Sequence, residues 1–205
     1  MTAIRDPIHR YLSEWLHVSE RGATWKNVRH FCGGRRATKE EIPKCYTGDN
    51  WLGVTLDEFL ACPSNPANNR QTRMLADLTL SGCYNQSIMP QAQKEEIMFK
   101  SAKTNLAQMA FFSVLKYPEI SQYMFEETFK ISFSVPFELR NESHSSKYID
   151  RITPQQLEKI KLVNQNDIKL YEFGEKLFLK RFNVIKLQDE DFEEEISEVV
   201  NADLE

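Results

Sequence analysis

The sequence lacks several features that define common protein classes. Its 205 residues contain no apolar run close to the roughly 20 residues of a membrane-spanning helix. Only seven residues are glycine, and they build no glycine-rich loop for a nucleotide phosphate. There is no internal repeat and no cluster of metal-ligand residues. Within these residues we therefore expect no transmembrane helix, no P-loop, no repeat array and no metal site.

Cysteine is also scarce, and no two of the four are spaced as C-x-x-C, the pattern typical of zinc sites. An even number in loop-rich sequence predicts two disulfides in an oxidising compartment, formed by Cys32, Cys45, Cys62 and Cys83. Three pairings are open, and four reduced thiols in a cytosolic protein are the alternative. Two N-x-S tripeptides, at Asn85 and Asn141, are candidate glycosylation sites.

The net charge of −4 conceals a basic region. Residues 187–205 contain nine acidic and no basic side chains, so residues 1–186 carry +5. The same excess of +5 is already present in residues 1–39. A basic region favours an anionic ligand such as a nucleotide, a nucleic acid or a sulfated sugar, although a merely solvated surface is the alternative. We expect the acidic tail to be mobile and solvated.

The first residues predict a strand end that leads into a helix. Asp6 and Pro7 form the pattern of a helix N-cap followed by proline at the first helical position. An apolar face with helical spacing follows, made of Ile8, Tyr11, Leu12, Trp15 and Leu16. A polar stripe with a spacing of four runs beside it, made of His9, Ser13 and His17. This stripe is either a binding face or simply a solvent-facing one.

The remaining pattern predicts mostly helices after a loop-rich stretch over residues 21–67. We expect helices over 69–80, with Met74 inward, and over 91–107 and 119–129. A short buried strand is expected over 109–115 and a second strand over 131–135. Thr153 begins a capping box and opens the longest helix, whose apolar stripe runs to Phe178.

Several segments together resemble one enzyme family. Residues 5–15 are similar to the 3′-phosphate-binding segment of sulfotransferases, with an arginine at a strand end and a serine eight residues later. Other segments resemble the heparan sulfate 6-O-sulfotransferases: RGATWK at 21–26, PANNRQ at 66–71, MLADL at 74–78, GCYN at 82–85, SAK at 101–103, MAFF at 109–112, QYMFE at 122–126, Asp167 and LYE at 170–172. The resemblance runs in order from about residue 4 to residue 185, and includes all four cysteines.

This resemblance implies transfer of a sulfuryl group from 3′-phosphoadenosine 5′-phosphosulfate (PAPS) to the 6-hydroxyl of glucosamine in heparan sulfate, without a metal. Arg5 and Ser13 correspond to the ligands of the 3′-phosphate, with help from the amides of the helix N-terminus. His17 and Trp25 correspond to residues that contact the saccharide, with core packing as the alternative for Trp25. A loop that closes over the nucleotide corresponds to Glu138, Leu139, Arg140, His144 and Ser145.

The sequence departs from the family at identifiable positions. The family usually has an arginine at the position of His144, so a permanent cation is replaced by a titratable one. The family's phosphosulfate loop and its histidine base correspond to positions upstream of Arg5. None of the four histidines here takes the place of that base, so we expect no catalytic residue in this chain and no turnover by residues 1–205 alone.

The resemblance implies an α/β fold, namely the C-terminal portion of a P-loop-like sulfotransferase domain, predominantly helical with a few strands. We expect a partial domain over 1–186 and a tail over 187–205. The full protein is expected in the Golgi lumen as a type II membrane protein that acts on heparan sulfate and binds no nucleic acid. The alternatives are a non-catalytic product that binds heparan sulfate and, suggested only by the basic N-terminal region, a nucleic-acid-binding helical domain.

Overall fold

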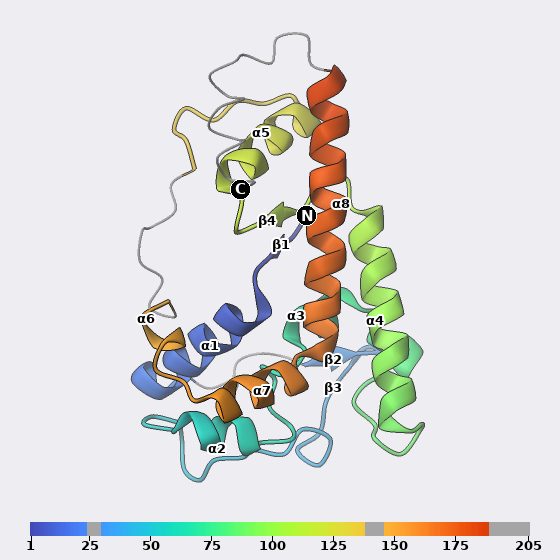
Figure 1. The fold of residues 1–205 in the computed structure, drawn as a ribbon. Helices are drawn as coiled ribbons and strands as arrows, with labels where there is room; N and C mark the ends of the chain where they lie inside the picture. The colour runs from blue at the N-terminus through green and yellow to red at the C-terminus, as the bar shows by residue number, and fades with distance from the viewer. Residues whose placement is uncertain (24–29, 138–145, 189–205) are drawn as a thin grey trace.

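The computed structural model describes residues 1–23, 30–137 and 146–188, which are mostly helical (Figure 1). Strand β1 covers Ala3–Ile4 and leads into helix α1 over Pro7–Arg21. The carboxylate of Asp6 accepts the N–H groups of Ile8 and His9, so this aspartate caps the helix as predicted. The prediction of a strand end followed by a capped helix is confirmed.

The other elements follow in chain order. A short hairpin is formed by β2 (Phe31–Cys32) and β3 (Arg35–Arg36). The helices are α2 (Leu56–Ala61), α3 (Arg70–Leu75), the 3₁₀ helix η2 (Leu78–Ser81), α4 (Gln91–Gln108), α5 (Pro118–Phe129), α6 (Ser146–Ile149), α7 (Pro154–Val163) and α8 (Gln165–Gln188). Strand β4 (Ser113–Val114) precedes α5. No helix in the described ranges is long and apolar enough to cross a membrane.

A parallel pair of strands lies at the centre of the larger of two cores. Ala3 of β1 pairs with Ser113, and Ile4 pairs with Val114. Helices α4, α5 and α8 surround this pair, with α8 running alongside α4 (Figure 1). The core contains Ile4, Leu106, Phe112, Val114, Ile120, Leu170, Phe178 and Phe182. The smaller core joins α1, α2 and α7 through Tyr11, Leu12, Trp51, Phe59 and Ile160.

Two expected helices are interrupted. The helix predicted over 69–80 ends at Leu75, because Ala76 is extended and the N–H of Asp77 donates to the side chain of Ser101. Met74, expected to point inward, is 73% exposed. The capping box at Thr153 is confirmed. The long helix expected after it is divided at Asn164 into α7 and α8. The side chain of Asn164 accepts hydrogen bonds from Arg10 of α1 and from the N–H of Asn69, just before α3.

The strand predicted over 131–135 is wrong. Ile131, Phe133 and Val135 are exposed, and no described strand lies beside them. Their segment instead folds back on α5, where the carboxylate of Glu126 accepts the N–H of Phe133. The buried strand expected over 109–115 is confirmed only in part, because Phe111, Phe112 and Val114 are buried but Leu115 is exposed, and only Ser113 and Val114 form a strand. The coarse fold prediction, mainly helical with a few strands, is confirmed, and the boundary at residue 186 stays a prediction.

The two predicted disulfides are confirmed, and the structure selects one of the three possible pairings. Cys32 pairs with Cys83 and joins the β2–β3 hairpin to the segment after η2. Cys45 pairs with Cys62 and joins the preceding loop to the end of α2. Both bonds lie in the stretch with little regular structure, where few backbone hydrogen bonds are available to hold the chain.

We expect the disulfide that closes the longer loop to stabilise the fold more. The Cys32–Cys83 bond spans 51 residues and the Cys45–Cys62 bond spans 17. Loop-closure entropy then predicts losses of about 4 and about 3 kcal/mol when each pair is replaced by serine. Urea unfolding of the two double variants measures these losses, and non-reducing peptide mapping checks the pairing. A free thiol in the folded protein, or a different pairing, would contradict this assignment.

Gly174 allows α8 to approach the N-terminal strand closely. A Cβ atom at this position would lie 2.5 Å from Cδ1 of Ile4 and 3.1 Å from Cδ2 of Leu106. Ile4 is 1% exposed and sits in β1, so its side chain has little room to move. Because Ile4 directly precedes Arg5, this contact also sets the position of the β1–α1 connection.

We expect Gly174→Ala to destabilise the protein, although alanine normally stabilises a helix by about 1 kcal/mol relative to glycine. Overpacking in a dense core costs about 1–3 kcal/mol and should exceed that gain. Thermal unfolding measures the difference. The matched control is Ile4→Val in the Gly174→Ala background, which removes the clashing Cδ1 and should restore part of the loss. A higher melting temperature for Gly174→Ala alone would show that the contact is unimportant.

Candidate functional site

The β1–α1 connection carries the first predicted ligand residue, Arg5, and is held through its backbone. The N–H of Arg5 donates to Oε1 of Gln71 at 2.8 Å, and its carbonyl accepts from Nε2 of Gln71 at 2.9 Å. A single side chain of α3 therefore satisfies both backbone groups of Arg5. The backbone of the predicted phosphate ligand is fixed without using its guanidinium group.

The guanidinium of Arg5 sits in a half-buried environment. Burial lowers the pKa of Arg5, the neighbouring Asp6 opposes this shift, and Arg10 adds to it. The ordinary value lies so far above neutrality that the group stays a cation in the physiological range. An arginine at a strand end in such surroundings can form charge-assisted hydrogen bonds to an anionic ligand.

The amides at the start of α1 already have an acceptor within the chain. Oδ1 of Asp6 accepts the N–H of Ile8 at 3.0 Å and that of His9 at 2.8 Å. These donors are therefore occupied by a carboxylate of the chain itself. The expectation that they help to bind a phosphate stays a prediction, and the side chains of Arg5 and Ser13 are the other predicted ligands at this end of α1.

The predicted polar stripe lies along one face of α1. Ser13 is half-buried and His17 is exposed, one turn further along the helix. Ser13 follows the first helical residue by six positions, which corresponds to about 9 Å along the axis. Trp15 is part of the packing instead, because its indole N–H donates to the carbonyl of Val54 and its ring meets Tyr148 edge-on. The helix thus separates a polar face from a packed one.

A buried polar cluster connects α1 to α3 and α8, and the pattern analysis did not single it out. Nη2 of Arg10 donates to the carbonyl of Ala67 and to Oδ1 of Asn164. Glu14 accepts from Arg10 and, at 3.0 Å, from Nε of Arg70. Burial raises the pKa of Glu14, while Arg10, Arg70 and Arg73 oppose the rise. The only signal in the sequence is the spacing of four between Arg10 and Glu14, which is typical of any exposed helix.

Helices α3 and α8 cap each other. Asn69, just before α3, accepts the N–H groups of Asn166 and Asp167 through its side-chain oxygen, at 3.0 and 3.2 Å. In return the carboxylate of Asp167 accepts the N–H groups of Gln71 and Thr72, at 3.0 and 2.7 Å. Each cap is supplied by the other helix. Residues almost 100 positions apart are thereby locked together, with Gln71 in place to hold Arg5.

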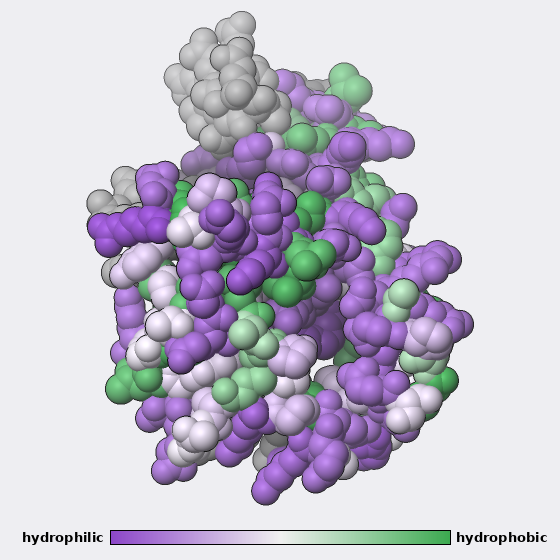
Figure 2. All heavy atoms as spheres, turned by 60° about the horizontal axis from the view of Figure 1, so that its bottom comes forward, coloured by the Kyte–Doolittle hydropathy of each residue, from purple (hydrophilic) through white to green (hydrophobic). Residues whose placement is uncertain are grey.

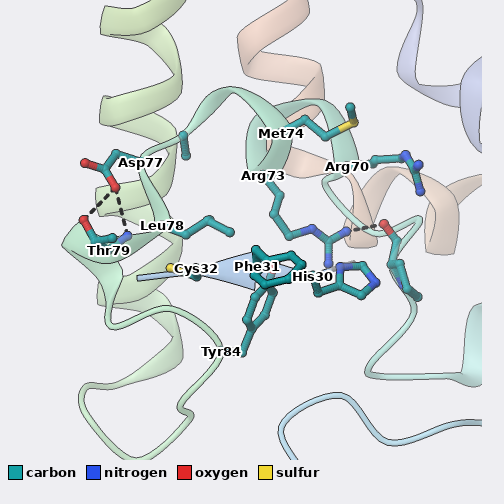
Figure 3. A pocket seen from close by; sticks show the side chains of 12 residues that line it. His30, Phe31, Cys32, Arg70, Arg73, Met74, Asp77, Leu78, Thr79 and Tyr84 are labelled. Carbon is teal, nitrogen blue, oxygen red and sulfur yellow. Dashed lines mark hydrogen bonds between the residues drawn. The ribbon is translucent and has the colours of Figure 1, made fainter. Parts of the chain in front are cut away.

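A pocket of about 410 Å³ lies on the other side of α3 (Figure 3). Its lining comes from the β2 region, the approach to α3, α3 itself and the segment that ends at Tyr84: His30, Phe31, Cys32, Pro66, Arg70, Arg73, Met74, Ala76, Asp77, Leu78, Thr79 and Tyr84. The Arg73 guanidinium lies beside the His30 imidazole (Figure 3), and the His30 ring in turn contacts the Tyr84 ring. At the far end, Asp77 accepts from the N–H and the hydroxyl of Thr79.

The electrostatics of this pocket are set by burial and by arginine. Burial lowers the pKa of Arg73, and Tyr84 and Asp167 oppose this. The pKa of His30 is lowered by burial first and then by Arg73 and Arg70. Burial raises the pKa of Tyr84, against the effect of Arg73. The imidazole and the phenol are therefore neutral near neutral pH, beside a half-buried cation.

Several predicted site residues lie outside the described residues. They are Trp25 and the nucleotide-loop residues Glu138, Leu139, Arg140, His144 and Ser145, together with the glycosylation candidate Asn141. The other candidate, Asn85, is described, and its side-chain oxygen accepts the N–H of Ser87. Within the described ranges no group of three or more His, Cys, Asp or Glu residues could hold a metal ion.

The geometry thus joins a cationic strand end, a polar helix face and a pocket with a half-buried cation around α3. Comparison with known proteins agrees with an anion-handling role. The chain is 48% identical over 189 residues to "Heparan-sulfate 6-O-sulfotransferase 2" of Danio rerio, which covers 92% of this chain and 40% of that protein. It is 46% identical over 183 residues to "Heparan-sulfate 6-O-sulfotransferase 1" of Cricetulus griseus, covering 89% and 45% respectively.

The chain spans about two fifths of the length of these curated relatives. A model of the sulfotransferase family matches residues 1–174, which include the smaller core, most of the larger one, the β1–α1 connection and the lining of the pocket. The match therefore covers most of the described residues, and the chain belongs to the sulfotransferase family.

Proposed function

We propose that this chain is part of an enzyme that transfers a sulfuryl group from PAPS to the 6-hydroxyl of glucosamine in heparan sulfate. The observation that carries the proposal is the 45–48% identity, over 92% of the chain, to several relatives named heparan-sulfate 6-O-sulfotransferase. The basic N-terminal region supports it, because both the donor and the acceptor are polyanions.

The nucleotide end of the proposed site is formed by Arg5 and Ser13. Arg5 supplies a fixed cation at the strand end, and Ser13 supplies a hydroxyl on the adjacent helix face. Both are suited to the 3′-phosphate of the nucleotide, which stays on the donor throughout the reaction. These residues therefore bind and orient PAPS and take no part in the transfer itself. The loop of residues 138–145 is proposed to close over the same nucleotide.

The saccharide end is proposed to lie further along α1. The exposed imidazole of His17 and the indole of Trp25 would contact the acceptor chain by hydrogen bonding and by stacking on a sugar ring. Lumenal glycosylation at Asn85 and Asn141, the Golgi location and a membrane anchor in the full protein are part of the same proposal. The two disulfides agree with an oxidising compartment.

A general base for the 6-hydroxyl is not assigned to any of the four histidines of this chain. General base catalysis is typically worth about 10²–10⁴-fold in rate, so its absence should abolish measurable turnover. The second candidate function, a heparan sulfate-binding product without activity, rests on this point. Binding of heparan sulfate is expected of both the enzyme and the inactive product, so only a measurement of sulfate transfer distinguishes them.

We expect the full chain of 205 residues to bind heparan sulfate but to transfer no labelled sulfate from PAPS. The decisive experiment is a chimera in which this chain replaces the matching 189 residues of the Danio rerio relative. Transfer by the chimera would support the enzyme, and binding without transfer would support the non-catalytic product. Turnover by residues 1–205 alone would contradict the expectation and place the base within the chain, with His17 tested first.

We expect Arg5→Ala to weaken the binding of adenosine 3′,5′-bisphosphate by more than tenfold, because a charge-assisted contact is worth roughly 1.5–3 kcal/mol. Ser13→Ala should cost about 1 kcal/mol, or about fivefold. Calorimetry measures both. The matched control is Arg21→Ala, which removes an exposed cation at the far end of the same helix and should leave the affinity unchanged. Equal losses of affinity in Arg5→Ala and Arg21→Ala would show that the nucleotide is attracted by the general positive charge and not bound by Arg5 specifically.

A further inference from the structure

The pocket behind α3 is separate from the proposed nucleotide site. Gln71 extends from this helix to the backbone of Arg5, whereas Arg73 and Met74 line the pocket. Arg70 also lines it, but Nε of this residue pairs with Glu14 of α1 at 3.0 Å. Helix α3 thus contacts Arg5, the predicted phosphate ligand, through one side chain and lines a pocket without an assigned ligand through others.

Three charged side chains line this pocket, Arg70, Arg73 and Asp77, and Arg73 is the arginine that lies beside His30. Its Nη2 atom donates to two neutral acceptors, the carbonyls of Pro66 and Asn68. Within the described ranges it forms no ion pair with a carboxylate. A guanidinium has five N–H donors, so donors at Nε and Nη1 remain for a further acceptor. A half-buried cation whose hydrogen bonds go to carbonyls favours an anionic ligand, although the carboxylates of Asp167 and Glu14 already offset part of its charge.

The aromatic side chains that line the rest of the pocket are suited to pack against a ring of the ligand. Phe31 is 49% exposed although it is a large apolar side chain, and the guanidinium of Arg36 lies 5.5 Å from its ring centre. Tyr84 meets His30 edge-on, with ring centres 5.8 Å apart. His30, neutral near neutral pH, can donate one hydrogen bond beside Arg73. Aromatic faces next to hydrogen-bond donors are typical of sites that bind rings with polar substituents.

Size and surroundings narrow the choice of ligand. A volume of about 410 Å³ lies at the small end of the range for ligand pockets, which is roughly 300–1,000 Å³. It suits a single sugar ring with its acidic substituent. Figure 2, in which the bottom of Figure 1 comes forward, shows a mostly hydrophilic surface with small, separate hydrophobic patches. A polar polymer fits this face better than an apolar protein partner does.

We propose that this pocket binds one acidic sugar ring of the acceptor polysaccharide, with its sulfate or carboxylate on Arg73 and His30 and its ring against Phe31. The inference rests on the function proposed above and adds a second contact, away from the α1 stripe, for the same polymer. A chain held at both places is oriented as well as bound.

The test is calorimetry of the full chain with a heparan sulfate hexasaccharide and, separately, with adenosine 3′,5′-bisphosphate. Arg73→Gln should weaken hexasaccharide binding about tenfold, and Phe31→Ala about fivefold. Lys130→Gln, which removes an exposed cation just after the end of α5, is the control matched for charge and should change hexasaccharide affinity less than twofold. Nucleotide affinity should stay within twofold in all three variants. A hexasaccharide that is desulfated and carboxyl-reduced should show no dependence on Arg73.

The outcomes separate this inference from the proposed function. Absence of hexasaccharide binding by the unmodified chain would overturn both the saccharide role and the pocket. Strong binding that both pocket variants retain would overturn the pocket alone. Parallel loss of nucleotide affinity in Arg73→Gln would assign Arg73 to the nucleotide and also contradict the proposal. If Arg73→Gln does not fold, Phe31→Ala decides, because this exposed ring is not needed for either core.

Discussion

The mutual capping of α3 and α8 is the constraint on which the rest of the structure depends. Asn69 and Asp167 each satisfy the first amides of the helix that carries the other. Neither helix could supply these bonds alone, since α3 has only six residues and gets no cap from its own Asn69 side chain. A hydrogen bond to a charged group contributes roughly 1.5–3 kcal/mol, so the two bonds to Asp167 are a large part of a typical folding free energy.

This constraint extends directly to the site. Asp167 fixes the first turn of α3, and that turn presents Gln71 to both backbone groups of Arg5. Gly174, about two helical turns after Asp167 along α8, lets Ile4 pack closely enough to bring β1 against the helix. Arg5 is therefore positioned from two directions by one helix and its partner. Precision of this kind matters for a phosphate ligand, because geometry sets the strength of a charge-assisted hydrogen bond.

Local sequence patterns correctly predicted the features that depend on interactions between residues close in sequence. The strand end and the cap at Asp6, the capping box at Thr153 and the existence of two disulfides could all be read from short stretches. The breaks at Ala76 and Asn164 could not, because their causes are side chains elsewhere in the chain, such as Ser101 and Arg10. The disulfide pairing likewise depends on which loops meet in space.

The same reasoning explains which site residues were missed. Arg5, Ser13 and His17 have the spacing of a family motif, so a resemblance could assign them roles. Arg73 has no such spacing. Its significance comes from being half-buried against the carbonyls of Pro66 and Asn68, beside an imidazole that the chain brings in from residue 30. Removing a cation from water is costly unless anions or several acceptors compensate for it. A sequence shows that an arginine is present, but only the fold shows that it faces a pocket next to an imidazole and aromatic rings.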